Sequence, residues 1–189
     1  MWKLIATSAY AQNPALRRAR QEGVFRTSID RRLLFANTRV VSVMMPEVAM
    51  IPDGTGGGSW LSVTVDVTTG QSIILSELLN GMKGLRAIAR RVYEEISRGN
   101  PCFARERSLY KGASGDFSPT WSHYANFALT PTGLAIGFPT ATVAPPPCGR
   151  ISTVVPYRIV TPYLTNVGAR MVRAVTASTP DRSTGLMRR

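Results

Sequence analysis

The sequence predicts a mixed domain of antiparallel strands and one long helix, and three observations lead to this prediction. Apolar residues alternate within Asn126–Leu164, where Thr130–Gly133 supplies a proline-glycine turn. A second alternating run spans Trp60–Val67, and the residues of Leu85–Arg98 repeat their apolar positions with helical spacing. Paired strands and a helix that covers them account for all three patterns.

The first part of the chain is expected to hold a helix and a hairpin. Asparagine followed by proline favours helix entry, which predicts a helix over Asn13–Gly23 that stops at its glycine. Further on, Arg32–Phe35 and Val40–Met45 have the β-branched and apolar composition of two hairpin strands. Pro46 cannot donate a backbone hydrogen bond, so it is expected to end or bulge the second strand.

The glycine-rich segment Pro52–Ser59 resembles a phosphate-binding loop only at first sight. Such a loop ends in Gly-Lys-Ser or Gly-Lys-Thr and leads directly into a helix. The alternating run Trp60–Val67 follows here instead, so the segment is interpreted as a flexible hairpin loop. Thr68–Gln71 then predicts a tight turn into a strand at Ser72–Leu75.

The strongest helix prediction is Leu85–Arg98, with a glycine at position 99 as its natural stop. Its apolar face consists of Leu85, Ile88, Ala89, Val92 and Ile96, which are expected to pack on the sheet. The opposite, solvated face carries Arg86, Arg90, Arg91, Glu94 and Glu95. A last, short helix is expected over Asn166–Ala177. Residues 1–178 are expected to form a single domain, and residues 179–189 a flexible tail.

The chain is strongly basic, with 23 Lys and Arg against 11 Asp and Glu and a net charge of +12. This excess attracts polyanions such as nucleic acid, anionic lipid headgroups or acidic wall polymers. A compositional bias that merely solvates the surface is the alternative. Nucleic acid is the disfavoured partner, because there is no long basic arm and the aromatic residues are not interleaved with arginine.

Two cysteines, Cys102 and Cys148, indicate either one structural disulfide or two buried thiols. They lack the CxxC spacing of a redox pair, and with His123 as the single histidine no metal site or cofactor is expected. The disulfide is favoured, and it predicts an oxidising, secreted or cell-envelope location. The sequence shows neither a transmembrane run nor a secretory signal.

The polar segment 102–122 is expected to be a long loop that ends in a cluster of aromatic residues. Trp121, His123 and Tyr124 come just before the hairpin, where they could line a small pocket or simply pack on the core. Arg150 and Tyr157 complete the set of candidate ligand-binding residues.

No catalytic residue is assigned. The best constellation for catalysis is His123 with Ser122 and Tyr124, oriented by Asp116 or Asp66. Adjacent residues of a strand point to opposite faces, so Ser122 cannot readily bond to its histidine neighbour. The chain is therefore not expected to be an enzyme.

Three segments together resemble a known family: Leu61–Leu79, the helix that begins at Leu85, and Asn126–Leu164. The first is similar to a family strand followed by a Thr-Gly turn. The last is similar to a family signature of Phe, Gly-Leu, Phe, Val-Ala-Pro, Gly and Pro-Tyr. The match, over Val40–Leu164, is to the RsiV-like extracytoplasmic domain. That domain ends a lysozyme-sensing anti-sigma factor, accompanies peptidoglycan deacetylases and forms a secreted mycobacterial immunogenic protein.

The resemblance implies an α+β fold: a twisted antiparallel sheet with one long helix packed on it and a C-terminal β-hairpin. It assigns scaffold roles, not catalytic ones, to the matched positions. Those of the turn and the following strand start are Asp66, Gly70 and Leu75. Those of the terminal ribbon and its loop are Phe127, Gly133, Phe138, Pro145, Gly149, Pro156 and Tyr157.

The expected function is that of a non-catalytic secreted or cell-envelope domain that binds an extracytoplasmic ligand. The alternative is electrostatic binding of anionic envelope lipids or polymers, including an anionic membrane surface, by the arginines. An envelope hydrolase centred on His123 is the third and weakest hypothesis. Lysozyme is a doubtful ligand, because it is itself strongly basic and two cationic partners repel each other.

Overall fold

The protein is described by a computed structural model over residues 26–29, 33–50, 56–103 and 115–177. The predicted helix Asn13–Gly23 and the predicted tail at 179–189 lie outside these ranges. The described residues form an α+β fold with antiparallel strand pairing throughout, as the sequence predicts. The strands are divided between two sheets.

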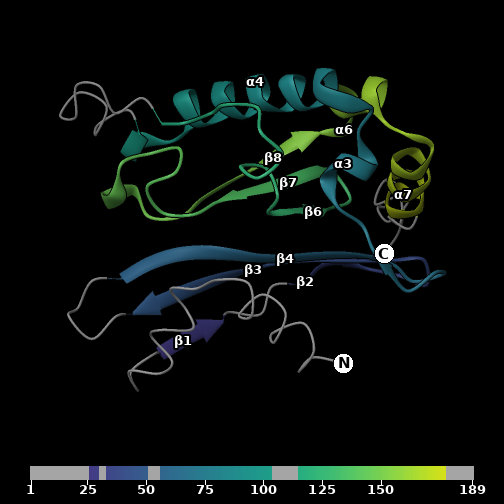
Figure 1. The fold of residues 1–189 in the computed structure, drawn as a ribbon, viewed down its shortest axis with the longest axis horizontal. Coiled ribbons are helices and arrows are strands. Elements are labelled where there is room, and N and C mark those ends of the chain that lie inside the picture. The colour runs from purple at the N-terminus through teal and green to yellow at the C-terminus, as the bar shows by residue number, and fades with distance from the viewer. Residues whose placement is uncertain (1–25, 30–32, 51–55, 104–114, 178–189) are drawn as a thin grey trace, which may run out of the picture.

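The elements are arranged in three layers (Figure 1). The long helix α4 (Gly81–Gly99) covers a three-stranded sheet, which lies on a five-stranded sheet. The strands of the larger sheet are β1 (Arg26–Ile29), β2 (Leu33–Ala36), β3 (Val40–Met50), β4 (Gly56–Asp66) and β5 (Gln71–Ser72). Those of the smaller sheet are β6 (Phe127–Leu129), β7 (Gly133–Phe138) and β8 (Ile151–Pro156). The shorter helices are α3 (Leu75–Leu78), η1 (Pro146–Cys148), α6 (Tyr157–Val160), η2 (Thr161–Tyr163) and α7 (Asn166–Thr176).

The β3–β4 hairpin corrects the prediction that Pro46 ends or bulges its strand. β3 continues through Pro46, which lies opposite Trp60, and pairs with β4 in unbroken register. In an antiparallel pair every second residue bonds to the partner strand, and the residues between them point their N–H and C=O groups to the other edge. The odd-numbered residues of β3 bond to β4, so the backbone nitrogen of Pro46 faces the opposite edge of β3. On that edge β2 ends its pairing at Val43 and β1 begins at Glu47. Among the described residues Pro46 thus has no partner on this edge, and its missing N–H group breaks no ladder bond of β1 or β2 with β3.

The turn after β4 is built around Asp66, as the resemblance implies. The Asp66 carboxylate accepts the Thr68 N–H at 2.9 Å, and Gly70 adopts a positive φ of 70° that favours glycine. The predicted strand over Ser72–Leu75 is wrong after its first residue. Of the predicted residues only Ser72 lies in β5, where it pairs with Val65 of β4. Leu75 begins α3, and its side chain is buried in the core.

Asp66 is the one buried carboxylate among the described residues, with a side chain 4% exposed. Burial alone would raise its pKa. The hydrogen bond from Thr68 and the Arg170 guanidinium, 3.1 Å away, outweigh burial and hold the pKa below its ordinary value. This carboxylate joins the β4–β5 turn to α7.

Acid is expected to weaken the fold through Asp66. The pKa of Asp66 is lower in the folded protein than in the unfolded chain. Its contribution to the free energy of unfolding is therefore complete above the unfolded pKa and is lost as pH falls through the folded pKa. We expect Asp66→Asn to lower the free energy of unfolding at neutral pH and to flatten the decline toward acid. Urea unfolding of both proteins between about pH 2 and 6 measures this. An acid decline of equal steepness in the two proteins would contradict the role.

The predicted hairpin in the second half of the chain is confirmed as β6 and β7. The Thr130 N–H donates to the Gly133 carbonyl at 2.9 Å, which closes the turn. All six residues of β7 are buried, because this central strand is covered on both faces. The predicted helix over Asn166–Ala177 is confirmed as α7, with Thr165 as its N-cap.

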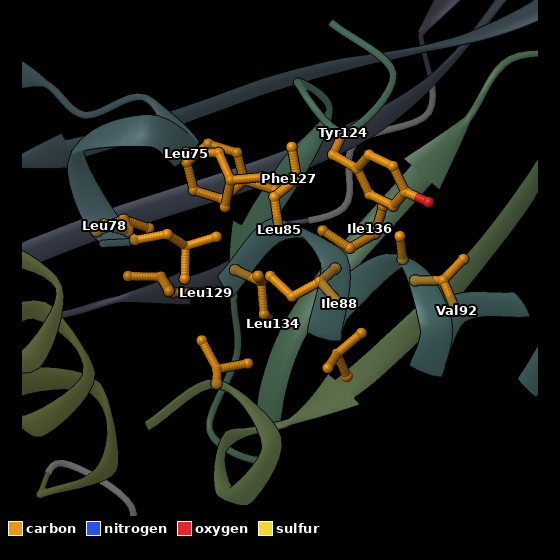
Figure 2. Close-up of a cluster of buried hydrophobic side chains, with 14 of the residues drawn as sticks. Leu75, Leu78, Leu85, Ile88, Val92, Tyr124, Phe127, Leu129, Leu134 and Ile136 are labelled. Atoms are coloured by element: carbon orange, nitrogen blue, oxygen red, sulfur yellow. The ribbon is translucent and has the colours of Figure 1, made fainter. Parts of the chain in front are cut away.

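The main core lies between α4 and the three-stranded sheet (Figure 2). The predicted apolar face of α4 is confirmed, because each of its five residues is buried. Figure 2 shows Leu85, Ile88 and Val92 of α4 among side chains from both strands of the hairpin, including Phe127, Leu129, Leu134 and Ile136. Burial of each such side chain contributes about 1.5–3 kcal/mol. This packing fixes α4 and leaves its opposite face to solvent.

The two sheets are joined by polar as well as apolar contacts. The Ser42 hydroxyl, buried in β3, accepts the Leu129 N–H of β6 at 2.7 Å. The indole N–H of Trp60 in β4 donates to the carbonyls of Phe138 and Ile151 at 3.1 and 3.2 Å. These side chains of the larger sheet bond to backbone groups of the smaller sheet. Because buried backbone groups need hydrogen-bond partners, the contacts help to fix how the two sheets lie on each other.

Cys102 and Cys148 form a disulfide, with their Cα atoms 5.5 Å apart. Cys102 follows the end of α4, and Cys148 lies in η1 just before β8. The bond therefore closes a chain segment of 46 residues that contains β6 and β7.

Candidate binding groove

A groove with a volume of about 580 Å³ runs along the solvated face of α4. One wall is the helix itself, and the other is formed by α6 and η2. The lining residues are Lys83, Arg86, Ala87, Arg90, Arg91 and Glu94 of α4, together with Ile159 and Tyr163. Four cations and one carboxylate thus surround a partly apolar trough.

The sequence of α4 builds this groove by dividing the helix into two faces. Its apolar face is buried on the sheet, so the residues between the apolar positions project to solvent. Gly84 lets the second wall approach, because a Cβ at this position would lie 2.8 Å from the Tyr163 Cβ. The Asn80 N–H donates to the Tyr163 carbonyl at 2.6 Å and holds η2 against the start of the helix.

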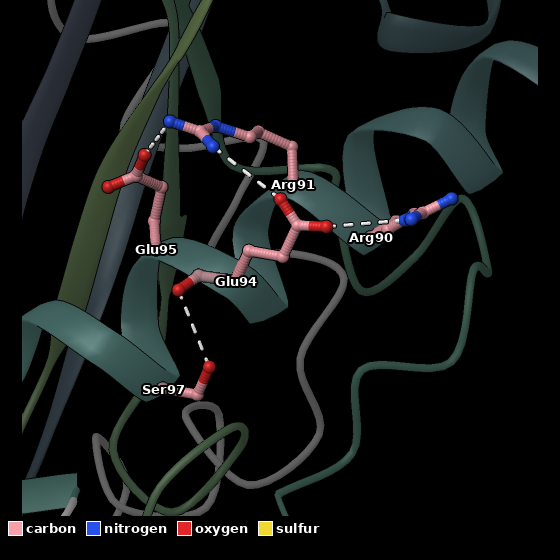
Figure 3. A network of polar contacts seen from close by, with 5 residues as sticks. All are labelled: Arg90, Arg91, Glu94, Glu95 and Ser97. Carbon is pink, nitrogen blue, oxygen red and sulfur yellow. Dashed lines mark hydrogen bonds and ion pairs between the residues drawn. The ribbon is translucent and has the colours of Figure 1, made fainter.

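The charges of the groove are unevenly paired (Figure 3). Glu94 bonds to Arg90 at 3.2 Å and to Arg91 at 3.5 Å, and Arg91 also pairs with Glu95. These contacts, drawn in Figure 3, orient both guanidinium groups at one end of the groove. Lys83 and Arg86, at the other end, are exposed and have no carboxylate partner among the described residues. The groove therefore suits an anionic ligand.

The sequence indicates the charged face of α4, but not that it lines a site. A row of cations at positions 83, 86 and 90 is the available signal, because residues three or four apart lie on one helix face. The second wall carries no such signal. Tyr163 reaches Gly84 only through the tertiary fold.

None of the five residues predicted to bind a ligand lines the α4 groove. Tyr124 has no exposed surface, and its ring packs edge-to-face on Phe138 with the centroids 5.4 Å apart. Burial raises the pKa of its hydroxyl, which donates to the Phe117 carbonyl. Trp121 is half-buried against the main core. In these positions both aromatic residues contribute to packing.

Arg150 and Tyr157 also make structural contacts. Arg150 donates to the Glu47 carbonyl at 2.9 Å and lies over the Trp60 ring, 5.7 Å from its centroid, so it ties the two sheets together. The Tyr157 hydroxyl donates to the Thr130 carbonyl at 2.7 Å, and burial raises its pKa. Tyr157 thereby holds the start of α6 against the β6–β7 turn, as the scaffold role implies.

His123 and Asp116 are brought together, with Nε2 and Oδ2 3.5 Å apart. The Ser118 side chain and N–H bond to Asp116 and lower its pKa, and His123 adds to this effect. Asp66, the other candidate acid, pairs with Arg170. Within the described residues the buried Nδ1 of His123 has no hydrogen-bond partner.

Ser122, the candidate nucleophile that precedes His123 in the sequence, has a different side-chain partner. The Ser122 hydroxyl bonds to Thr120 at 3.4 Å. A nucleophilic serine is expected to bond to its general base.

Solved structures of DUF3298 family proteins are similar to this chain. The first, a DUF3298 family member from Bacteroides fragilis, has a TM-score of 0.64 and 13% identity, and the match covers 88% of this chain and 66% of that one. The second, a DUF3298 family protein from Pseudomonas aeruginosa, has a TM-score of 0.54 and 11% identity, with coverages of 82% and 71%. DUF3298 is the family of the RsiV-like domain, so the fold implied by the resemblance is shown. Neither a family profile nor a curated protein matches the sequence.

Proposed function

We propose that this chain is a non-catalytic, RsiV-like binding domain that works outside the cytoplasm and holds an anionic envelope polymer in the α4 groove. The observation that carries the proposal is the row of cations along one wall of a trough whose other wall is Ile159 and Tyr163. Preformed concave sites with a few converging polar groups are typical of ligand binding.

The spacing of the cations favours a linear polyanion. Lys83 and Arg90 are seven residues apart with Arg86 between them, so at 1.5 Å per residue the three cations span about 10 Å along the helix axis. A strand with an anionic group in each repeat can lie along this axis and meet several cations at once. The Tyr163 ring offers an apolar surface to the backbone of the same strand.

The shape of the groove favours a polymer over a membrane surface. A flat bilayer touches protruding residues, so it can reach the exposed cations of α4 but not the full trough between α4 and the α6–η2 wall. The apolar side chains at the trough, Ile159 and Tyr163, are partly covered and do not protrude like the anchors of an interfacial helix. Acidic vesicles are therefore expected to compete poorly with a soluble polymer.

The location outside the cytoplasm is supported by the Cys102–Cys148 disulfide, because such bonds persist in oxidising compartments. In the residues that the structure describes, no helix combines the length and apolarity needed to cross a bilayer. The absence of catalysis is supported by the arrangement at His123, whose neighbour Ser122 bonds elsewhere.

Reversal of Lys83 and Arg86, the groove cations without a carboxylate partner among the described residues, is expected to weaken binding strongly. The probe is fluorescently labelled poly(glycerol phosphate), and its affinity is measured by anisotropy. At about 1 kcal/mol for each cation near an anionic partner, Lys83→Glu with Arg86→Glu should weaken binding by roughly 30-fold or more. The new carboxylates lie near the start of α4, where the helix dipole tolerates them, so the fold should be kept.

The matched control is Arg39→Glu with Arg173→Glu, which changes the net charge equally at exposed positions outside the groove. Because its substitutions lie outside the groove, this variant should lose only the long-range electrostatic attraction between protein and polymer, which salt screens, and should bind the polymer more tightly than the groove variant. Equal losses in the two variants would contradict a groove site and indicate general electrostatic binding. Hydrolysis of wall glycans, peptides or acyl esters that is lost in His123→Ala would contradict the non-catalytic assignment.

A further inference from the structure

The strand β8 forms an edge of the three-stranded sheet, beyond β7. It pairs with β7 along its whole length, and its outer side has no partner strand in the described part of the chain. Natural edge strands are usually protected by charged residues, bulges or a covering element. The β8 sequence, Ile-Ser-Thr-Val-Val-Pro, contains no charged residue. Its proline, Pro156, stands at the last position, so the protection that proline gives an edge is absent from the strand interior at Ser152 and Val154.

The hydrogen bonds of β7 determine which peptide groups of β8 face outward. Gly137 uses its N–H on the β6 side, where it donates to the Asn126 carbonyl at 2.8 Å. Ser152 lies opposite Gly137, and both members of such a pair point away from their shared ladder. The same holds for Val154, two residues further along. The N–H and C=O groups of Ser152 and Val154 therefore face away from the sheet.

The side chains at this edge are also accessible. Val154 is 43% exposed and Ser152 is exposed, whereas Ile151 and Val155 of the same strand are buried. A strand beside β8 would find hydrogen-bonding groups and an apolar contact at Val154. When a peptide adds to a sheet edge as a strand, main-chain hydrogen bonds supply the affinity, and contacts with every second side chain supply the selectivity.

The charge of the chain indicates what kind of strand fits. A second copy of this chain also carries +12, so mutual repulsion disfavours pairing of two β8 edges. An acidic segment is attracted instead, and the exposed Arg158 lies two residues beyond the end of β8. We propose that β8 takes up an extended, acidic peptide segment of a partner protein as an additional strand. This surface is separate from the α4 groove and does not depend on its function.

The test uses a synthetic peptide of alternating valine and threonine with two aspartates at each end, and binding is followed by fluorescence anisotropy. Wild-type protein should bind it. The same peptide with alternate amides N-methylated, on the side that would face β8, should bind at least about tenfold more weakly, because main-chain donors are lost while charge is kept. Equal binding of the two peptides, or no binding of the first, would overturn the proposal.

Two protein variants locate the contact. Val154→Pro removes an outward N–H and no bond of the β7–β8 ladder, and it should weaken peptide binding by at least about tenfold. Val154→Glu should do the same through repulsion, whereas its matched control Val67→Glu, at an equally exposed valine, should bind like wild type. The glutamate pair keeps the test valid if the proline variant does not fold.

The remaining outcomes distinguish this proposal from the groove and from self-association. Peptide binding that is lost in Lys83→Glu with Arg86→Glu but kept in Val154→Glu would place the peptide in the groove and overturn the edge proposal. A wild-type dimer in sedimentation that Val154→Glu abolishes, without peptide binding, would show a second copy at the edge and overturn the acidic partner. Loss of polymer binding alone would leave the edge proposal standing.

Discussion

Reduction of the Cys102–Cys148 disulfide is expected to lower the free energy of unfolding by about 4 kcal/mol. The closed segment of 46 residues sets this value, because the crosslink removes loop entropy from the unfolded chain. The bond also ties the end of α4 to the η1 turn that precedes β8, so its loss releases the helix end from this turn. Small domains are stable by only about 5–15 kcal/mol, so the effect is a large fraction of the total.

Urea unfolding with and without a thiol reductant measures this effect. The variant with both Cys102→Ala and Cys148→Ala is the control, since it should unfold like the reduced protein and ignore the reductant. Thiol titration of the purified, denatured protein gives an independent result, which should be near zero. Two titratable thiols, or an unchanged urea midpoint after reduction, would contradict the structural role and the location outside the cytoplasm.

Replacement of Trp60 by alanine is expected to destabilise the protein by about 3 kcal/mol, in the range of large-to-small core substitutions. The indole fills the space between the two sheets and packs against Met44. It also approaches Gly137 so closely that a Cβ there would lie 2.7 Å from the ring. Truncation would leave a cavity at the point where the sheets meet, and the Arg150 side chain would lose its aromatic contact.

Trp60→Phe separates packing from hydrogen bonding at this position. Phenylalanine keeps most of the apolar contact but removes the N–H that donates to the Phe138 and Ile151 carbonyls. We expect a loss of about 1–2 kcal/mol, the usual cost of a lost hydrogen bond in a partly buried site. Thermal or urea unfolding of both variants measures the difference. A phenylalanine variant as unstable as the alanine variant would show that the cavity contributes little.

Elements with a local repeat were predictable from the sequence. The alternation in the β6–β7 hairpin and the apolar stripe of α4 each lie within one short segment, and the structure confirms both. The division into two sheets depends on contacts that are distant in sequence, such as the bond from Leu129 to Ser42. The residue pattern within β3 or β6 does not indicate that these two strands face each other from different sheets.

The predictions at Pro46 and Leu75 are wrong for the same reason: each depends on contacts with residues outside its own segment. Proline disrupts a strand where its nitrogen faces a partner, and the described residues of β1 and β2 place no partner opposite Pro46. Leu75 has the apolar character of a strand residue, but the core draws it into a short helix. Among the candidate site residues, the tertiary fold buries Tyr124 and commits Arg150 to the sheet interface.

The most direct measurement of the groove proposal is a titration of isotope-labelled protein with poly(glycerol phosphate), followed by amide NMR shifts. The proposal predicts that the largest shifts fall on positions 83–94 of α4 and on Ile159 and Tyr163, and that added salt reverses them. Shifts spread evenly over the basic surface, or concentrated around His123, would contradict it.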